Sequence, residues 1–277
     1  MSLSINTNMG AMVALQNLNM TSADLQTTQS HISTGLKVAS AKDDGATYAI
    51  AQSQRATVSS LDAVKDSLNR ASSSVDVAMS AGESISDMLT QMKEKALAAS
   101  DTSLDTTSRT ALNTDFAALR DQITKTISNA TFNGINLVNG SLTNGLTALA
   151  NASGTSVLTI AGENLSLGGS IISVSSSAGF TTATSANALL STIDTSINQV
   201  SAALAKLGTS SKAVANHMTF IGKLQDSLTA GIGNLVDADM AQESAKLQAL
   251  QTKQQLGIQA LSIANQAPQA AVSLFRG

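Results

Sequence analysis

The chain has 277 residues, with 16 basic and 19 acidic side chains and a formal net charge of −3. It contains no cysteine, two histidines and 2% aromatic residues, which excludes disulfide scaffolds, zinc fingers, thiol nucleophiles and stacking surfaces for single-stranded nucleic acid. The balanced charge also excludes a basic nucleic-acid footprint, and a single proline in an alanine-rich chain predicts long helices.

The first 36 residues carry one charge, Asp24, and their apolar residues recur with helical spacing. Uncharged polar residues fill the other faces, so we expect this helix to be surrounded by protein on several sides. No basic residue precedes Lys37, so a conventional signal peptide is not expected, and no apolar run is long enough to span a membrane. The predicted packing residues of this segment are Leu18, Leu25 and Ile32.

Between residues 61 and 99, apolar or small residues alternate at spacings of three and four, as in the seam of a coiled coil. A helix of that length extends about 58 Å, so we expect a rod in this part of the chain. A further helix is expected over about 105–129, turned back on the first by the polar linker 100–108. The predicted core residues of the first block are Leu61, Leu68, Val75 and Leu89.

The middle of the chain, 133–187, is rich in glycine, serine, threonine and asparagine and has one charge, Glu163. The runs Val157–Ile160 and 171–174 predict a small β-hairpin region with loops. Its hydroxyl-rich and expected outermost position suggests O-glycosylation, the alternative being a bare polar loop. The candidate acceptors are Ser175, Ser176, Ser177, Thr181 and Thr182.

A second heptad block covers residues 190–235 and extends about 69 Å as a helix. Its predicted rod-core residues are Val200, Leu207, Val214, Ile221 and Leu228. Beyond it, no charge lies between Lys253 and Arg276, and a second uncharged helix is expected. The predicted packing residues of this helix are Leu256, Ile263 and Leu274.

These segments predict a mainly α fold, an elongated antiparallel helical bundle or coiled coil with paired N- and C-terminal helices and a small β-hairpin insertion. We expect three parts. Residues 1–44 with 238–277 form an inner terminal coiled-coil domain, residues 45–132 with 188–237 form a helical rod domain, and residues 133–187 form the polar insertion of the rod.

Short motifs occur in a fixed order at both ends of the chain. They read Ile-Asn-Thr-Asn at 5–8, Ser-Thr-Gly-Leu-Lys-Val at 33–38, Ser-Ala-Lys-Asp-Asp-Gly-Ala at 40–46, Thr-Phe-Asn-Gly at 131–134, Val-Asp-Ala-Asp-Met-Ala-Gln-Glu at 236–243 and Gln-Ala-Leu-Ser-Ile-Ala-Asn-Gln at 259–266. Each also has a local explanation: Asp239 with Gln242 suits a helix N-cap, Asn133-Gly134 suits a turn, and Asp43-Asp44 precedes a helix. In this order the motifs resemble those of bacterial flagellin, over about 1–140 and 185–277.

The resemblance implies a structural subunit that polymerises with itself into the extracellular flagellar filament used for swimming. It implies terminal helices that line the inner tube and fold on assembly, and a short, alphaproteobacterial type of subunit without large outer domains. It also implies export, without a cleaved signal, through the flagellar type III apparatus. The implied partners are an export chaperone, hook-associated proteins and the cap protein, with no nucleic acid or membrane.

One property of the family is not expected here. In many flagellins the first rod helix contains a Leu-Gln-Arg-x-Arg-Glu-Leu motif that Toll-like receptor 5 recognises. The segment of this chain that is similar to it is 89–95. Gln91 stands in place of an arginine, Lys95 in place of a leucine, and Asp115 corresponds to a partner glutamate. Losing a bidentate donor and placing a charge at an apolar anchor predict weak or no receptor activation.

Other functions fit less well. There is no phosphate-binding glycine loop, no serine elbow and no histidine pair at metal-ligand spacing, so neither catalysis nor a cofactor or metal is expected. His31 and His217 are interpreted as packing or hydrogen-bonding residues. A signalling coiled-coil hairpin is an alternative, although it would have a helical tip where this chain has a glycine-rich insertion. A hook–filament junction protein shares the terminal pattern and is the other alternative.

Overall fold

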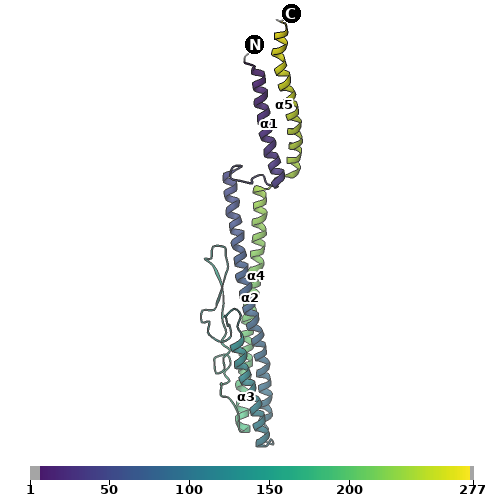
Figure 1. Ribbon diagram of the computed structural model, residues 1–277. Coiled ribbons are helices and arrows are strands. Elements are labelled where there is room, and N and C mark those ends of the chain that lie inside the picture. Colours follow the sequence, from purple (N-terminus) through teal and green to yellow (C-terminus); the bar gives the residue numbers. More distant parts are fainter. Residues whose placement is uncertain (1–6, 275–277) are drawn as a thin grey trace. The chain divides into compact units, whose positions relative to one another are not determined.

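The computed structural model describes residues 7–274, with side chains as far as residue 266. Its elements are α1 (Met9–Thr34), α2 (Gly45–Ala99), α3 (Thr106–Asn129), β1 (Leu146–Leu149), β2 (Val157–Ile160), α4 (Ala183–Val236) and α5 (Met240–Leu274) (Figure 1). The chain divides into two compact units, one formed by its two ends up to Ala56 and from Ser227, the other by Thr57–Asp226. The protein is thus mainly helical with one small sheet, as the sequence predicts.

In the unit Thr57–Asp226, α2 and α4 run antiparallel. Gln225 contacts residues 58 and 62, and Lys93 forms an ion pair with Asp194. Residue numbers therefore increase along α2 as those of their partners on α4 decrease. The apolar seams predicted from the heptads are buried between the helices. Buried positions include Leu61, Leu68, Val75, Leu89, Val200, Leu207, Val214 and Ile221.

The turn from α2 into α3 is organised by Arg109, which is almost fully buried. Its Nε donates to the Ala99 carbonyl at 3.0 Å, and its Nη2 donates to the carbonyls of Asp101 and Leu104 at 2.9 and 3.0 Å. The first of these bonds satisfies a carbonyl at the C-terminus of α2 that the helix itself leaves free. Asp105 caps α3 by accepting from the Ser108 amide at 2.6 Å.

The helix α3 holds the end of the insertion in place. Phe116 is fully buried and meets Phe180 edge to face, with 5.3 Å between ring centroids. Beside it, the Phe180 amide donates to Asn113 Oδ1 at 2.7 Å, and Arg120 Nη1 donates to the Ala178 carbonyl at 2.9 Å. An apolar contact and two polar ones therefore fix the segment that leads into α4.

The strand pairing differs from the one predicted. Strand β2 is where the sequence placed it, but its antiparallel partner is β1, with Leu146 opposite Ile160, and residues 171–174 form no strand. Ile172 makes one isolated bridge with Leu167, and Ile172 and Val174 are buried. The alternating apolar residues of 171–174 therefore serve the core, where the Ser173 amide donates to Ser196 Oγ of α4 at 3.2 Å.

Candidate functional site: the paired terminal helices

The helices α1 and α5 lie side by side and run antiparallel (Figure 1). Asn8 Nδ2 donates to the Ala264 carbonyl at 2.7 Å, Leu18 packs on Gly257, and His31 pairs with Glu243, so the contacts run in opposite directions along the two helices. The seam is narrow and built from small or uncharged residues. On α1 it contains Ala11, Ala14, Leu18, Thr21, Leu25, Thr28 and Ile32, and on α5 it contains Leu247, Leu250, Gln254, Gly257, Leu261 and Ala264.

The predicted packing residues of the two helices have different surroundings in the single chain. Leu18, Leu25 and Ile32 of α1 are half-buried. Leu256 and Ile263 of α5 are 59% and 69% exposed, because the seam uses a different set of heptad positions. The side chain of Leu274 lies outside the described residues. The role of these residues in a filament core stays a prediction.

Both helices also keep apolar side chains outside the seam, on more than one side of the helix, that the single chain leaves in water. On α1 the exposed residues are Met9, Met12, Val13, Leu15 and Met20, and on α5 they are Met240, Leu256, Ile258 and Ile263. Exposed apolar residues in this number, on two neighbouring helices whose polar residues are mostly uncharged, are typical of a surface that binds protein. The arrangement can therefore bury these faces on other chains.

The base of the pair is a short backbone junction. Gly35 ends α1 with a φ of 70°, and its amide donates to the His31 carbonyl at 2.8 Å. The amides of Lys37 and Val38 donate to the Val236 carbonyl at 2.7 and 3.2 Å, and the Ala238 amide donates back to the Gly35 carbonyl at 2.9 Å. These bonds tie the end of α1 to the turn before α5, where the Gly-Leu and Asp-Ala-Asp motifs meet.

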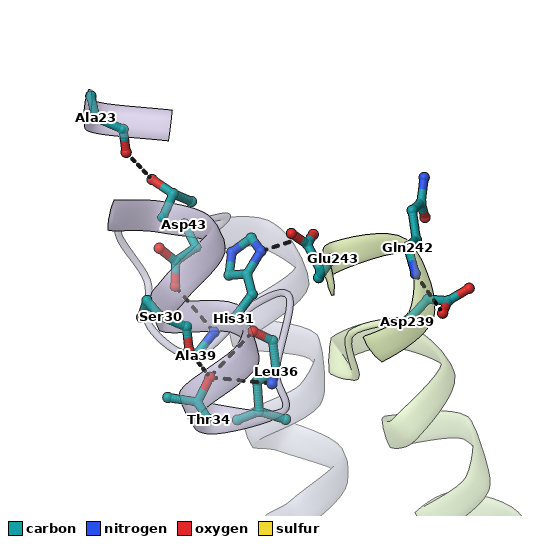
Figure 2. Close-up of polar contacts among 11 residues, drawn as sticks. Ala23, Ser30, His31, Thr34, Leu36, Ala39, Asp43, Asp239, Gln242 and Glu243 are labelled. Atoms are coloured by element: carbon teal, nitrogen blue, oxygen red, sulfur yellow. Dashed lines mark hydrogen bonds and ion pairs between the residues drawn. The ribbon is translucent and has the colours of Figure 1, made fainter. Parts of the chain in front are cut away.

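Figure 2 shows the polar side chains of this junction. His31 Nδ1 lies 3.2 Å from Glu243 Oε1, and the two side chains are only 12% and 14% exposed. The hydrogen bond from His31 is the main cause that lowers the pKa of Glu243, assisted by the charge of Lys246 and opposed by burial. The side chain of Thr28 on α1 makes a smaller contribution that also lowers the pKa of Glu243.

Three of the four aspartates in the motifs, Asp43, Asp44 and Asp239, accept hydrogen bonds from nearby backbone amides. Asp44 Oδ1 accepts from the amides of Ala46 and Thr47 at 3.0 Å each and begins α2. Asp239 Oδ1 accepts from the Ala241 and Gln242 amides, as an N-cap of α5 should.

Asp43 Oδ2 accepts from the amides of Ala39 and Ser40, which closes the loop before α2. Hydrogen bonds from Ser40 to Asp43 and from Thr47 to Asp44 are the main causes that lower the pKa of these two carboxyl groups.

Sequence reasoning did not identify Gln225 as a contact residue of the rod seam. Gln225 is buried between α2 and α4, where its Nε2 donates to the Val58 carbonyl at 3.1 Å and to Asp62 Oδ1 at 2.8 Å. Leu228, a predicted core residue, is only half-buried. A polar residue at a heptad seam position is the signal that could have identified Gln225 as a register-setting contact.

The segment compared with the receptor motif has a feature that sequence reasoning missed. Lys95 Nζ lies 2.7 Å from Asp115 Oδ2 of α3, and Lys93 Nζ lies 2.6 Å from Asp194 of α4. Gln91 borders the same shallow hollow as Lys95 and Asp115. Lys95 and Asp115, two of the three residues at which this chain differs from the receptor motif, therefore neutralise each other's charge between α2 and α3.

The five candidate glycosylation residues are all exposed, but they are not equivalent. Ser175 Oγ and Ser177 Oγ lie 3.1 Å apart in a hydrogen bond, and Thr182 Oγ1 accepts from the Ser185 amide at the start of α4. Ser176 and Thr181 lie outside these bonds, which makes them the hydroxyls that could be modified without breaking a local contact.

Within the residues that the structure describes, no group of three or more histidine, cysteine or acidic side chains could hold a metal ion. None of the described helices combines the length and apolar character that a bilayer-crossing segment requires. The polar groups of the junction are used in caps and in one ion pair.

Comparison with known proteins identifies the family. The model of the bacterial flagellin N-terminal helical region matches residues 5–143, and that of the C-terminal helical region matches residues 190–275. Flagellin FljM of Caulobacter vibrioides is 58% identical over 99% of this chain and 98% of its own length. A flagellin of Brucella melitensis is 36% identical, and Flagellin C of Rhizobium meliloti is 33% identical, each over 99% of both chains.

These matches favour neither of the two alternatives, a hook–filament junction protein and a signalling coiled-coil hairpin. The order of motifs, the two paired terminal helices and the matches over nearly the full length agree with one another. The chain belongs to the bacterial flagellin family and is a structural subunit of the flagellar filament.

Proposed function

We propose that copies of this chain build the filament core through the outward apolar faces of α1 and α5. The observation that supports this is the exposure of Leu256, Ile263 and the methionine-rich face of α1 in the single chain. A filament requires a contact between unlike surfaces that does not close into a ring. Two apolar faces on one antiparallel pair provide unlike surfaces, so each pair can contact several neighbours.

We further propose that the terminal helices fold when a subunit joins the filament. The α1–α5 seam buries threonines, places Gly257 against Leu18 and contains few large apolar side chains, so its own contribution to stability is small. Isolated helices with so little burial are marginal in water, whereas burial of the outward faces on neighbours would add the missing free energy. Folding and association would then be one event.

Limited trypsin digestion tests this proposal. In the soluble chain we expect cleavage at Lys37, Lys42, Lys246 and Lys253, and in seeded filaments, confirmed by electron microscopy of the same samples, we expect these sites to be protected. A soluble chain whose ends resist trypsin and which never forms filaments would contradict the proposal, because it would be a self-contained helical bundle.

The remaining roles follow from the family. We infer that the subunit reaches the extracellular filament through the type III export apparatus with an export chaperone, and that it meets hook-associated and cap proteins at the filament ends. The role is structural and not enzymatic. Loss of export in a cell that lacks the flagellar export apparatus, with normal synthesis of the chain, is the expected result, and export in such a cell would contradict this route.

Weak or absent activation of Toll-like receptor 5 is expected. The Lys95–Asp115 ion pair supports this expectation, since it occupies the carboxylate that a receptor would read and puts an ammonium at an apolar anchor. In a reporter-cell assay the response should be at least about 30-fold weaker than that of a flagellin with the full motif, the size expected for loss of a hot spot. Gln91→Arg combined with Lys95→Leu should raise it, and Lys65→Leu on the same helix should not. A wild-type response equal to that of the full-motif flagellin would contradict the proposal.

O-glycosylation of the insertion is proposed at Ser176 and Thr181, the exposed hydroxyls outside the local hydrogen bonds. Intact-mass measurement of filaments taken from the native cell should exceed the sequence mass, and Ser176→Ala and Thr181→Ala should each remove part of the excess. A mass equal to that of the sequence would eliminate the proposal.

A further inference from the structure

The methionines of the described residues fall into two groups. On α1, Met9, Met12 and Met20 are 67%, 58% and 52% exposed. Met240, at the start of α5, is exposed as well. The methionines of the unit Thr57–Asp226 are all buried or half-buried, namely Met79, Met88, Met92 and Met218. The most accessible thioether sulfurs therefore lie on the terminal helices.

The three methionines of α1 share one side of the helix, and we call Met9, Met12 and Met20 the methionine stripe. An α-helix turns by about 100° per residue, so these three positions fall within a sector of about 80°. Leu18, which packs on Gly257 of α5, lies on the opposite side of α1. A chemical change in the stripe therefore leaves the contact between α1 and α5 intact.

We propose that the methionine stripe is an oxidation site that decides whether a subunit can join the filament. This inference rests on the proposed function, in which copies of the chain bury the stripe between them. A peroxide transfers one oxygen atom to a thioether sulfur and forms methionine sulfoxide. The sulfur loses two electrons, hydrogen peroxide is reduced to water, and no bond of the protein chain breaks.

Oxidation converts the stripe from an adaptable apolar surface into a polar one. Methionine fits irregular neighbouring surfaces because its side chain is unbranched, flexible and polarisable. A sulfoxide at the same place is polar, and its burial is unfavourable unless it finds a hydrogen-bond donor. Oxidised subunits should therefore assemble poorly, whereas sulfurs already buried between subunits should react slowly. The block is reversible, because methionine sulfoxide reductases restore the thioether.

The test exposes the soluble chain to hydrogen peroxide, removes the oxidant with catalase and locates sulfoxides by peptide mass spectrometry. We expect oxygen to be added in the stripe, while Met88 and Met92 stay unmodified because they are buried. Seeded polymerisation followed by sedimentation then measures the critical concentration, which should rise about tenfold or more after oxidation. In filaments assembled before the treatment, the stripe should be oxidised several-fold more slowly than in the soluble chain.

Two variants and one enzyme treatment locate the effect. The triple variant Met9→Leu, Met12→Leu and Met20→Leu keeps the stripe apolar but removes the sulfurs. Peroxide should change its critical concentration by less than about twofold, relative to its own untreated sample. The double variant Met79→Leu and Met218→Leu, in the other unit, should respond as the wild type does. Methionine sulfoxide reductases acting on both sulfoxide epimers should restore polymerisation of the oxidised wild type.

An unchanged critical concentration in a wild-type chain with mapped sulfoxides in the stripe would overturn the inference. So would a stripe that peroxide does not oxidise in the soluble chain, or a triple variant that keeps the wild-type response. Equal oxidation rates in filaments and soluble chain would also overturn it, while the outward face of α5 keeps its separate test in Leu256→Asp and Ile263→Asp. Failure of the untreated wild-type chain to form filaments would count against the proposed function instead.

Discussion

Replacing Leu256 or Ile263 by aspartate is expected to abolish filament formation and leave the soluble chain as stable as before. Both side chains are more than half exposed in the single chain, so the substitution removes no buried contact there. In the proposed core each aspartate would be a carboxylate without a partner, at a cost of about 3 kcal/mol or more for every subunit. That cost raises the concentration at which subunits polymerise by roughly 100-fold or more.

Sedimentation of seeded polymer across a range of subunit concentrations measures this critical concentration, and circular dichroism of the soluble chain checks its fold. Gln199→Asp is the control, since it adds the same charge to an exposed position of α4, outside the proposed α5 surface. Normal filaments from both Leu256→Asp and Ile263→Asp would show that this face of α5 is not buried between subunits.

Replacing Arg109 by methionine is expected to destabilise the unit Thr57–Asp226 by about 2–4 kcal/mol. The methionine fills a similar volume but donates to none of the three carbonyls that Arg109 binds. Those oxygens would lose charge-assisted bonds at the end of α2, and the α2–α3 turn would lose the group that joins its three parts. The melting temperature of this unit should fall by on the order of 10 °C.

Thermal unfolding followed by circular dichroism measures this change. Arg70→Met is the matched control, because Arg70 is exposed on α2 and its loss should shift the melting temperature little. Arg109→Lys should fall between the two, since an ammonium keeps the charge but not the planar set of donors. If Arg109→Met and Arg70→Met had the same melting temperature, the α2–α3 turn would not depend on the hydrogen bonds of Arg109.

The heptad blocks were predictable from the sequence because each has one face with a clear majority of large apolar residues. Leu61, Leu68 and Val75 stand among charged or hydroxyl neighbours, so only one register buries them. Capping is local in the same way: Asp105 and Asp239 lie at the starts of helices, where short side chains with acceptor oxygens bind free amides.

The seam of α5 could not be predicted by the same rule. This helix has leucine, isoleucine and alanine on several faces, so both the set containing Leu250 and Leu261 and the set containing Leu256 and Ile263 fit a heptad. Which set meets α1 depends on the partner surface, where Leu18 needs the space over Gly257. A chain that binds several neighbours needs more than one apolar face, and this need makes the sequence ambiguous.

The strand partner and the polar contacts required three-dimensional information. Residues 146–149 contain two leucines, a threonine and an alanine, a weaker β pattern than residues 171–174, yet the first run pairs and the second packs on the core. Arg109 and Gln225 gain their roles from carbonyls that lie near them only after the helices have turned back. Sequence spacing does not encode such encounters directly.

The buried amide of Gln225 also bears on how alike the members of a long polymer are. If α2 slid against α4 by one heptad, the Gln225 amide would lose the Val58 carbonyl and the Asp62 carboxylate, and Arg55 or Asn69 would take the place of Asp62. The misaligned subunit would thus be less stable than the native one before it joined the filament. In a structure made from many copies of one building block, a contact that rejects irregular copies limits the defects that would otherwise accumulate along its length.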